Sequence, residues 1–182
     1  FSRCRSFNLD EYVGLTPGHP CSYRRFMDDE LFSHINIKET NVPLGSAPDL
    51  QAETQRYDAM IEQAGGIDIQ LLGLGQNGHI GFNEPDRSFS YGTQVVTLTK
   101  NTIKANRRFF GSENDVPRQA ISLGIGGIMK ARQIVLIAYG ISKAQAVRDM
   151  IKGPVDPMCP SSILQLHPDT VILLDAQAAS LL

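Results

Sequence analysis

The sequence predicts an α/β protein built on a doubly wound, mostly parallel sheet. Short apolar runs alternate with segments of helical periodicity, the pattern of successive strand–helix–strand units. The clearest strands are Ile67–Leu72 and Gln133–Tyr139, which are nearly continuous in apolar residues, as strands buried on both faces of a parallel sheet are. With 182 residues, 42% hydrophobic and 20% charged, the chain has the usage of one ordinary globular domain. These features together favour a three-layer, Rossmann-like arrangement.

The first element is a strand within Phe1–Asn8. No cap, turn or helix precedes it, so it looks like the interior of a domain cut at a strand. Asp10 and Glu11 follow at the carboxyl end of this strand, where open α/β sheets bind their ligands. Two adjacent carboxylates there are candidates for acid–base chemistry. The alternative is that they cap or turn the backbone.

Two helices are expected next. Ser22 is a suitable N-cap for a helix that runs to about His34, and Pro48 suits the first turn of a second helix. Gly65 and Gly66 end the second helix.

A glycine-rich loop follows the strand Ile67–Leu72 and looks at first like a dinucleotide fingerprint. That fingerprint needs a helix opening inside the motif and an acidic residue about 20 positions later. Here Pro85 interrupts any helix, and no acid occurs between Asp86 and Glu113. The sequence therefore argues against a nicotinamide or flavin, and we expect no cofactor. The motif glycines are Gly73, Gly75 and Gly78.

His79 lies in this loop. An imidazole has an ordinary pKa of about 6.5 and suits proton transfer at neutral pH. Glu84 is placed to orient it, while Asn77 can only position it or hydrogen-bond. The alternative is a histidine that merely satisfies loop carbonyls. No H-E-x-x-H motif and no Cys/His cluster occurs, so we expect no metal.

Basic residues suggest an anion site. A short helix over Asn101–Phe110 carries Lys104, Arg107 and Arg108, either as a solvated face or as a fork for a phosphate. Lys143 stands at the start of a helix with Ser142 as its N-cap. The helix dipole disfavours a cation there unless both share a bound anion.

The remaining expected elements are strands and short helices in alternation. They are a strand at Val95–Thr99, a strand at Pro117–Leu123, a turn and helix at Gly124–Ala131, a short helix at Ser161–Gln165 and a last strand at Thr170–Leu174.

Composition excludes several partners. The net charge of −2 favours no nucleic acid, and no apolar run reaches the roughly 18 residues that span a membrane. Three scattered cysteines fit a reducing compartment. We therefore expect a cytoplasmic protein.

Five stretches resemble the glucosamine-6-phosphate deaminases. Two are long signature motifs, and three shorter stretches match in order and approximate spacing. They are Phe7–Gly14 (FNLDEYVG), Gly73–Pro85 (GLGQNGHIGFNEP), Asn106–Phe110, Gly140–Ala144 and Leu164–Pro168.

This resemblance implies a reaction that turns glucosamine 6-phosphate and water into fructose 6-phosphate and ammonia, without cofactor or metal. It implies that Asp10 shuttles a proton between C2 and C1 of the open-chain sugar. It implies that His79 opens the sugar ring, helped by Glu84 and Asn77. Some members carry Asp at the position of Asn77, so the charge beside His79 is expected to come from Glu84 alone.

The resemblance also implies that Arg108 and Lys143 hold the phosphate, with Gly75 and Gly78 on the substrate side. The segment 99–117 resembles the family's active-site lid. The family's opening strands and helix, with a glycine- and threonine-bearing phosphate loop, have no counterpart in this sequence. The resemblance therefore implies a fold that lacks its N-terminal strand–loop–helix portion. We expect one domain over 1–182 that binds a small sugar phosphate as a monomer or homo-oligomer, with the monomer favoured.

Two other functions fit the same pattern. A 6-phosphogluconolactonase shares the fold and the glycine–histidine loop, although Glu84 and the Asp10–Glu11 pair favour the deaminase. A non-catalytic sugar-phosphate sensor is disfavoured because no basic DNA-binding segment is present.

Overall fold

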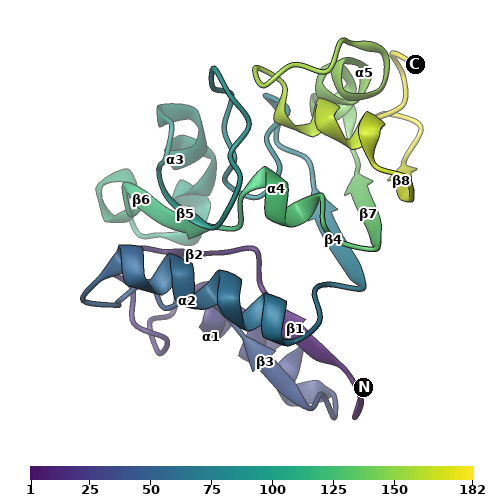
Figure 1. The fold of residues 1–182 in the computed structure, drawn as a ribbon. Coiled ribbons are helices and arrows are strands. Elements are labelled where there is room, and N and C mark those ends of the chain that lie inside the picture. The colour runs from purple at the N-terminus through teal and green to yellow at the C-terminus, as the bar shows by residue number, and fades with distance from the viewer. The chain divides into compact units, whose positions relative to one another are not determined.

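The computed structural model describes all 182 residues and divides them into two compact units (Figure 1). Unit 1 comprises residues 1–61 and 93–122, and unit 2 comprises residues 62–92 and 123–182. The single domain expected for 1–182 stays a prediction.

Unit 1 contains a small parallel sheet. Strand β1 (Arg5–Phe7) pairs in parallel with β3 (Glu39–Asn41), and helix α2 (Leu50–Gln63) lies alongside (Figure 1). The fully buried Tyr57 of α2 donates its hydroxyl to the carbonyl oxygen of Asn8 at 2.7 Å. The first strand and α2 were predicted, whereas β3 was not.

A second sheet of unit 1 is antiparallel. Its strand order is β2-β6-β5, and β6 lies in the middle. Asp10 and Glu11 are therefore strand residues and not part of a loop after β1. The prediction of a mostly parallel sheet holds for the other two sheets and not for this one. The strands are β2 (Asp10–Tyr12), β6 (Gln119–Ser122) and β5 (Gln94–Thr97).

Helix α1 (Tyr23–Glu30) begins where the sequence predicts. The Ser22 side chain accepts a hydrogen bond from the backbone N–H of Arg25 at 3.0 Å. The helix proper ends at Glu30, and a 3-10 turn continues to His34. The other helical elements of unit 1 are η1 (Phe32–His34), α3 (Lys100–Asn106), η2 (Arg107–Phe109) and η3 (Glu113–Asp115).

Unit 2 is built on the parallel sheet that the sequence predicts. Its strands β4 (Ile69–Gly73), β7 (Gln133–Ala138) and β8 (Thr170–Leu174) are ordered β4-β7-β8. Leu72 faces Leu136 in the register, and both side chains are buried. These two leucines belong to the core of unit 2.

The other face of this sheet is open, which corrects an expectation. The apolar run of β4 predicts burial on both faces, but Ile69 is 62% exposed and Leu71 is 58% exposed. On β8, Leu173 is 50% exposed. The residues that alternate with them point into the core. An apolar sequence shows what a strand is able to bury, and it does not show what covers the strand.

The helices of unit 2 flank this sheet. Helix α5 (Ala144–Lys152) buries Val147 and Met150. Ser142 is not its N-cap, because the 3-10 turn η4 (Ile141–Lys143) precedes it and Lys143 takes the cap position without a side-chain cap. The other two are α4 (Ile125–Ile128) and η5 (Pro160–Leu166). None of the helices in the chain combines the length and apolar character needed to cross a membrane.

Candidate active site

The loop after β4 brings three predicted site residues of unit 2 together. The ring nitrogen Nδ1 of His79 lies 2.6 Å from Oδ1 of Asn77. Nδ2 of Asn77 donates to Oε2 of Glu84 at 2.7 Å. The direct separation between His79 Nδ1 and that Glu84 oxygen is 3.4 Å. Asn77 therefore bridges the histidine and the carboxylate.

This bridge fixes the proton on the ring. A carboxylate only accepts hydrogen bonds, so the amide NH₂ of Asn77 faces Glu84 and its oxygen faces His79. An amide oxygen only accepts as well, so Nδ1 of His79 carries the hydrogen and Nε2 of the neutral ring is the proton acceptor. The sequence predicts that Glu84 orients His79 and supplies the charge, and that Asn77 positions it or hydrogen-bonds. In the structure Asn77 makes the shorter contact with the ring and bonds Glu84 at its other end.

The glycines shape the loop around this histidine. The backbone N–H of Gly75 donates to the carbonyl of His79 at 2.8 Å, and a Cβ on Gly75 would overlap the His79 ring. Gly78 has a φ of 84°, and a Cβ there would lie 2.7 Å from Sγ of Cys159. Both positions thus require glycine for reasons internal to the loop. Their contact with substrate stays a prediction.

Lys143 reaches the same loop from the end of η4. Its Nζ donates to the carbonyl oxygen of Leu74 at 2.7 Å. Leu74 directly follows β4, so the ammonium group stands at the carboxyl end of a parallel strand, where α/β sheets bind ligands. This position agrees with a role in binding an anion.

Unit 1 holds the other predicted base, Asp10. It pairs with Ser122 across β2 and β6. Burial, and to a smaller extent the neighbouring charge of Glu11, raise the pKa of Asp10 from 3.8 to about 7. A carboxyl group with a pKa near neutrality can both take and return a proton at physiological pH.

The hydrogen bonds of the two adjacent carboxylates decide between acid–base chemistry and capping of the backbone. The side chain of Glu11 is buried and accepts hydrogen bonds from backbone N–H groups of Tyr12, Tyr23 and Arg24. Glu11 thus caps the backbone, the structural alternative. Asp10 is left as the candidate for proton transfer.

Arg108 lies in η2 of unit 1. Its guanidinium carbon is 4.6 Å from the centre of the Phe109 ring. The next residue, Phe110, packs edge-on against Tyr12 with ring centres 5.5 Å apart, and Tyr12 stacks on Tyr23 at 5.3 Å. These rings connect the segment that carries Arg108 to β2 and α1. The assignment of 99–117 as a lid stays a prediction.

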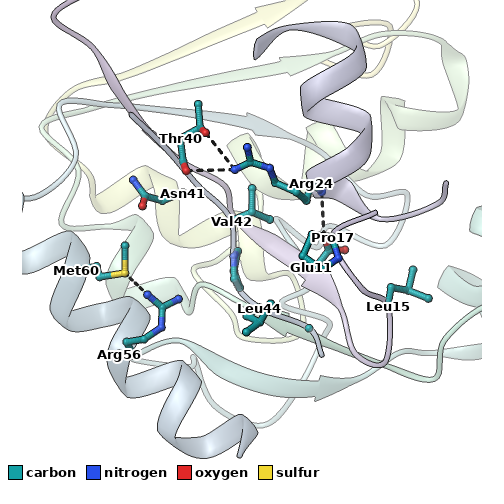
Figure 2. Close-up of a pocket in the computed structure, with 12 residues that line it drawn as sticks. Glu11, Leu15, Pro17, Arg24, Thr40, Asn41, Val42, Leu44, Arg56 and Met60 are labelled. Atoms are coloured by element: carbon teal, nitrogen blue, oxygen red, sulfur yellow. Dashed lines mark hydrogen bonds between the residues drawn. The ribbon is translucent and has the colours of Figure 1, made fainter. Parts of the chain in front are cut away.

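A pocket of about 390 Å³ also opens within unit 1 (Figure 2). None of the predicted site residues lines it, although Glu11 does. The two arginines that line the pocket are hydrogen-bonded to neighbouring side chains of unit 1, Arg24 to Thr40 and Arg56 to Glu53. The pocket lining also includes Leu15, Pro17, Asn41, Val42, Pro43, Leu44, Gly45 and Met60.

The parallel sheet with the hydrogen-bonded His79–Asn77–Glu84 loop after β4 belongs to the α/β class that binds ligands at the carboxyl ends of its strands. The chain belongs to the family of glucosamine-6-phosphate isomerases and 6-phosphogluconolactonases, whose model matches residues 1–173. It is 55% identical to a glucosamine-6-phosphate deaminase of Thermoanaerobacter pseudethanolicus, covering 100% of this chain and 73% of that protein. It is 52% identical to one of Clostridium perfringens, covering 100% of this chain and 76% of that protein.

One solved structure gives the same family, and a second gives the same fold. A monomeric glucosamine-6-phosphate deaminase superposes with a TM-score of 0.94 at 47% identity, covering 97% of this chain and 74% of that one. A 6-phosphogluconolactonase from Thermotoga maritima superposes with a TM-score of 0.74 at 17% identity, covering 95% and 73%. The second likeness concerns the fold alone.

Proposed function

We propose that this protein converts glucosamine 6-phosphate and water to fructose 6-phosphate and ammonia. The observation that carries the proposal is the hydrogen-bonded chain from His79 through Asn77 to Glu84 on the strand-end loop. Relatives that are more than 50% identical and bear the name glucosamine-6-phosphate deaminase support it.

His79 opens the sugar ring in this proposal. Ring opening needs a proton on the ring oxygen and the removal of one from the anomeric hydroxyl, and a single imidazole nitrogen can perform both transfers in turn. The bond to Asn77 occupies Nδ1, which leaves Nε2 for the substrate.

Asp10 acts on the open-chain sugar. As a carboxylate it removes the proton from C2, and it then returns a proton to C1. The C1 oxygen gains a proton and the amino nitrogen loses one, so that C1 becomes an alcohol carbon and C2 an imine carbon. The C1 carbon is reduced while C2 is oxidised, so the electrons balance within the substrate and no redox cofactor is needed. Water then replaces the nitrogen at C2 and releases ammonia.

Arg108 and Lys143 bind the phosphate in this proposal. A phosphate held by cationic side chains orients the reacting end of the sugar, and this orientation lowers the barrier. We further propose that the protein acts in the cytoplasm as a monomer. The monomeric relative at 47% identity supports this oligomeric state, and size-exclusion chromatography tests it.

The deciding experiment is incubation with glucosamine 6-phosphate and measurement of released ammonia. Stoichiometric ammonia and fructose 6-phosphate are the expected products. Hydrolysis of 6-phosphogluconolactone without ammonia release would assign the protein to the lactonases of the family. Binding of the sugar phosphate without turnover would assign it to non-catalytic sensors.

A further inference from the structure

Glu11 follows Asp10 in β2 and accepts hydrogen bonds from the first backbone N–H groups of helix α1. We propose that Glu11 is a positioning residue for Asp10, one that anchors the start of β2 to helix α1 and places a second carboxylate beside the first. This inference rests on the proposed function, because that function gives Asp10 its role as the base.

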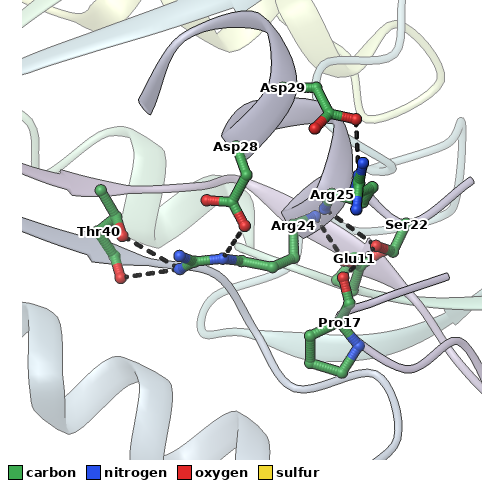
Figure 3. Close-up of polar contacts among 8 residues, drawn as sticks. All are labelled: Glu11, Pro17, Ser22, Arg24, Arg25, Asp28, Asp29 and Thr40. Carbon is green, nitrogen blue, oxygen red and sulfur yellow. Dashed lines mark hydrogen bonds and ion pairs between the residues drawn. The ribbon is translucent and has the colours of Figure 1, made fainter. Parts of the chain in front are cut away.

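The anchor consists of three backbone hydrogen bonds. Oε1 of Glu11 accepts from the N–H of Tyr12 at 2.8 Å and of Tyr23 at 3.0 Å. Oε2 accepts from the N–H of Arg24 at 2.9 Å, the bond of the three that Figure 3 shows. The first turn of a helix leaves such N–H groups without partners inside the helix. Glu11 satisfies two of them at α1 and one within its own strand, so it joins the helix and the strand directly.

Helix α1, which Glu11 bonds, is itself held in place by side-chain hydrogen bonds. The guanidinium of Arg24 donates from Nε to Asp28 at 2.9 Å and from Nη1 to Thr40 of β3 at 3.1 Å (Figure 3). The connection from β3 through α1 to Glu11 therefore restrains the backbone of β2 at the residue next to Asp10. Motion of Glu11 would move Asp10 with it.

Glu11 is also the charged neighbour of Asp10. Burial raises the pKa values of the nearby tyrosines, that of Tyr12 to about 12, so these phenols are neutral at physiological pH. Burial raises the pKa of Glu11 above its ordinary value, while the backbone amides that bond it and the nearby His19 act in the opposite direction. The charge that raises the pKa of Asp10 is that of Glu11. The charge of Asp10 in turn helps to raise the pKa values of the nearby Tyr12, Tyr23 and Tyr57.

The test is the pH dependence of kcat/KM for ammonia release. Glu11→Gln keeps the length of the side chain but removes its charge, so the acid limb of the profile should move to lower pH. Glu11→Asp keeps the charge but shortens the reach to α1, so kcat should fall with little change in KM. The control is Glu53→Gln. Glu53 is a buried carboxylate of the same unit that bonds the N–H of Leu44, and its loss should leave the acid limb in place.

A second measurement does not depend on turnover or on a variant that folds. In the unmodified protein, the carboxyl carbon signal of Asp10 should titrate in two steps, one of which coincides with the titration of Glu11, if the charge of Glu11 acts on Asp10 as proposed. A single-step titration of Asp10, or an acid limb that is unchanged in Glu11→Gln, would overturn the inference. An unmodified protein that releases no ammonia but shows the coupled titration would refute the proposed function and retain the coupling.

Discussion

The Nδ1 atom of His79 lies 2.6 Å from the side-chain oxygen of Asn77, closer than its 3.4 Å separation from the carboxylate of Glu84. A neutral amide thus stands between the imidazole and the charge. The amide orients the His79 ring relative to Glu84, because its nitrogen only donates, to Glu84, and its oxygen only accepts, from His79.

Asn77→Ala should lower kcat by about tenfold to a hundredfold, a part of the roughly 10²- to 10⁴-fold that a positioned acid–base group contributes. KM should change less, because the bridge orients His79 and does not bind the sugar. Steady-state ammonia release measures both constants. Gln76→Ala is the matched control, since Gln76 is exposed in the same loop. An equal loss in both variants would contradict this role for Asn77.

Asp10→Asn should abolish turnover and leave the affinity for glucosamine 6-phosphate nearly intact, because the amide keeps the shape of the side chain but cannot take a proton. Calorimetric titration gives the affinity, and the ammonia assay gives the turnover. In the unmodified protein, activity should fall on the acid side as the pH drops through about 7, the pKa of Asp10. A collapse of affinity in Asp10→Asn would instead make Asp10 a binding or folding residue.

The same variant should be more stable than the unmodified protein at pH 8. The pKa of Asp10 is raised from 3.8 to about 7 on folding, so the unfolded chain ionises first and the fold loses stability as pH rises between these values. Asp10→Asn removes this loss. The gain in the free energy of unfolding should be at least about 1 kcal/mol at pH 8, since one pKa unit corresponds to about 1.4 kcal/mol. Urea unfolding should show the gain at pH 8 and none below pH 3.8.

Gly75→Ala should displace the His79 ring, because the added Cβ would overlap it. Overpacking of this kind lowers the free energy of unfolding by about 1–3 kcal/mol. The displaced His79 ring should also lower kcat. Gly73→Ala is the control, since a Cβ at Gly73 meets no atom within 4 Å. Thermal unfolding and ammonia release are the measurements. Equal tolerance of the two substitutions would show that the ring of His79 moves freely.

Lys143→Met should reduce kcat/KM for glucosamine 6-phosphate about tenfold to a hundredfold, because a hydrogen bond to a charged group contributes about 1.5–3 kcal/mol. Its activity on unphosphorylated glucosamine should match that of the unmodified protein. Lys130→Met is the control, since Lys130 lies over the ring of Tyr91 at 5.0 Å. Equal losses on both substrates would separate Lys143 from phosphate recognition.

The longer, strongly patterned elements could be predicted from the sequence. Strands β4, β7 and β8, the N-cap Ser22 and the end of α2 all follow from apolar runs, cap residues and glycines. Strands β2 and β3 span three residues each, too few to show a period. Their partners come from distant parts of the chain, so neither their existence nor the antiparallel pairing of β2 could be predicted.

The proximity of His79, Asn77 and Glu84 could be predicted from the sequence, and the hydrogen bonds among them could not. The glycine loop indicated that His79, Asn77 and Glu84 lie close together. Sequence spacing could not show which end of the Asn77 amide faces the ring. Nor could it distinguish Asp10 from Glu11, because that difference depends on α1, whose first N–H groups bond only Glu11 of the two.

The hydrogen bond from Lys143 to the carbonyl of Leu74 has a consequence for the entropy of binding. A lysine loses much rotamer freedom when it is fixed on a ligand, about 0.5–1.5 kcal/mol for an immobilised side chain. Here folding has already restricted the lysine at the strand end. An arriving anion would therefore meet an ordered ammonium group, and more of the interaction energy would remain as affinity.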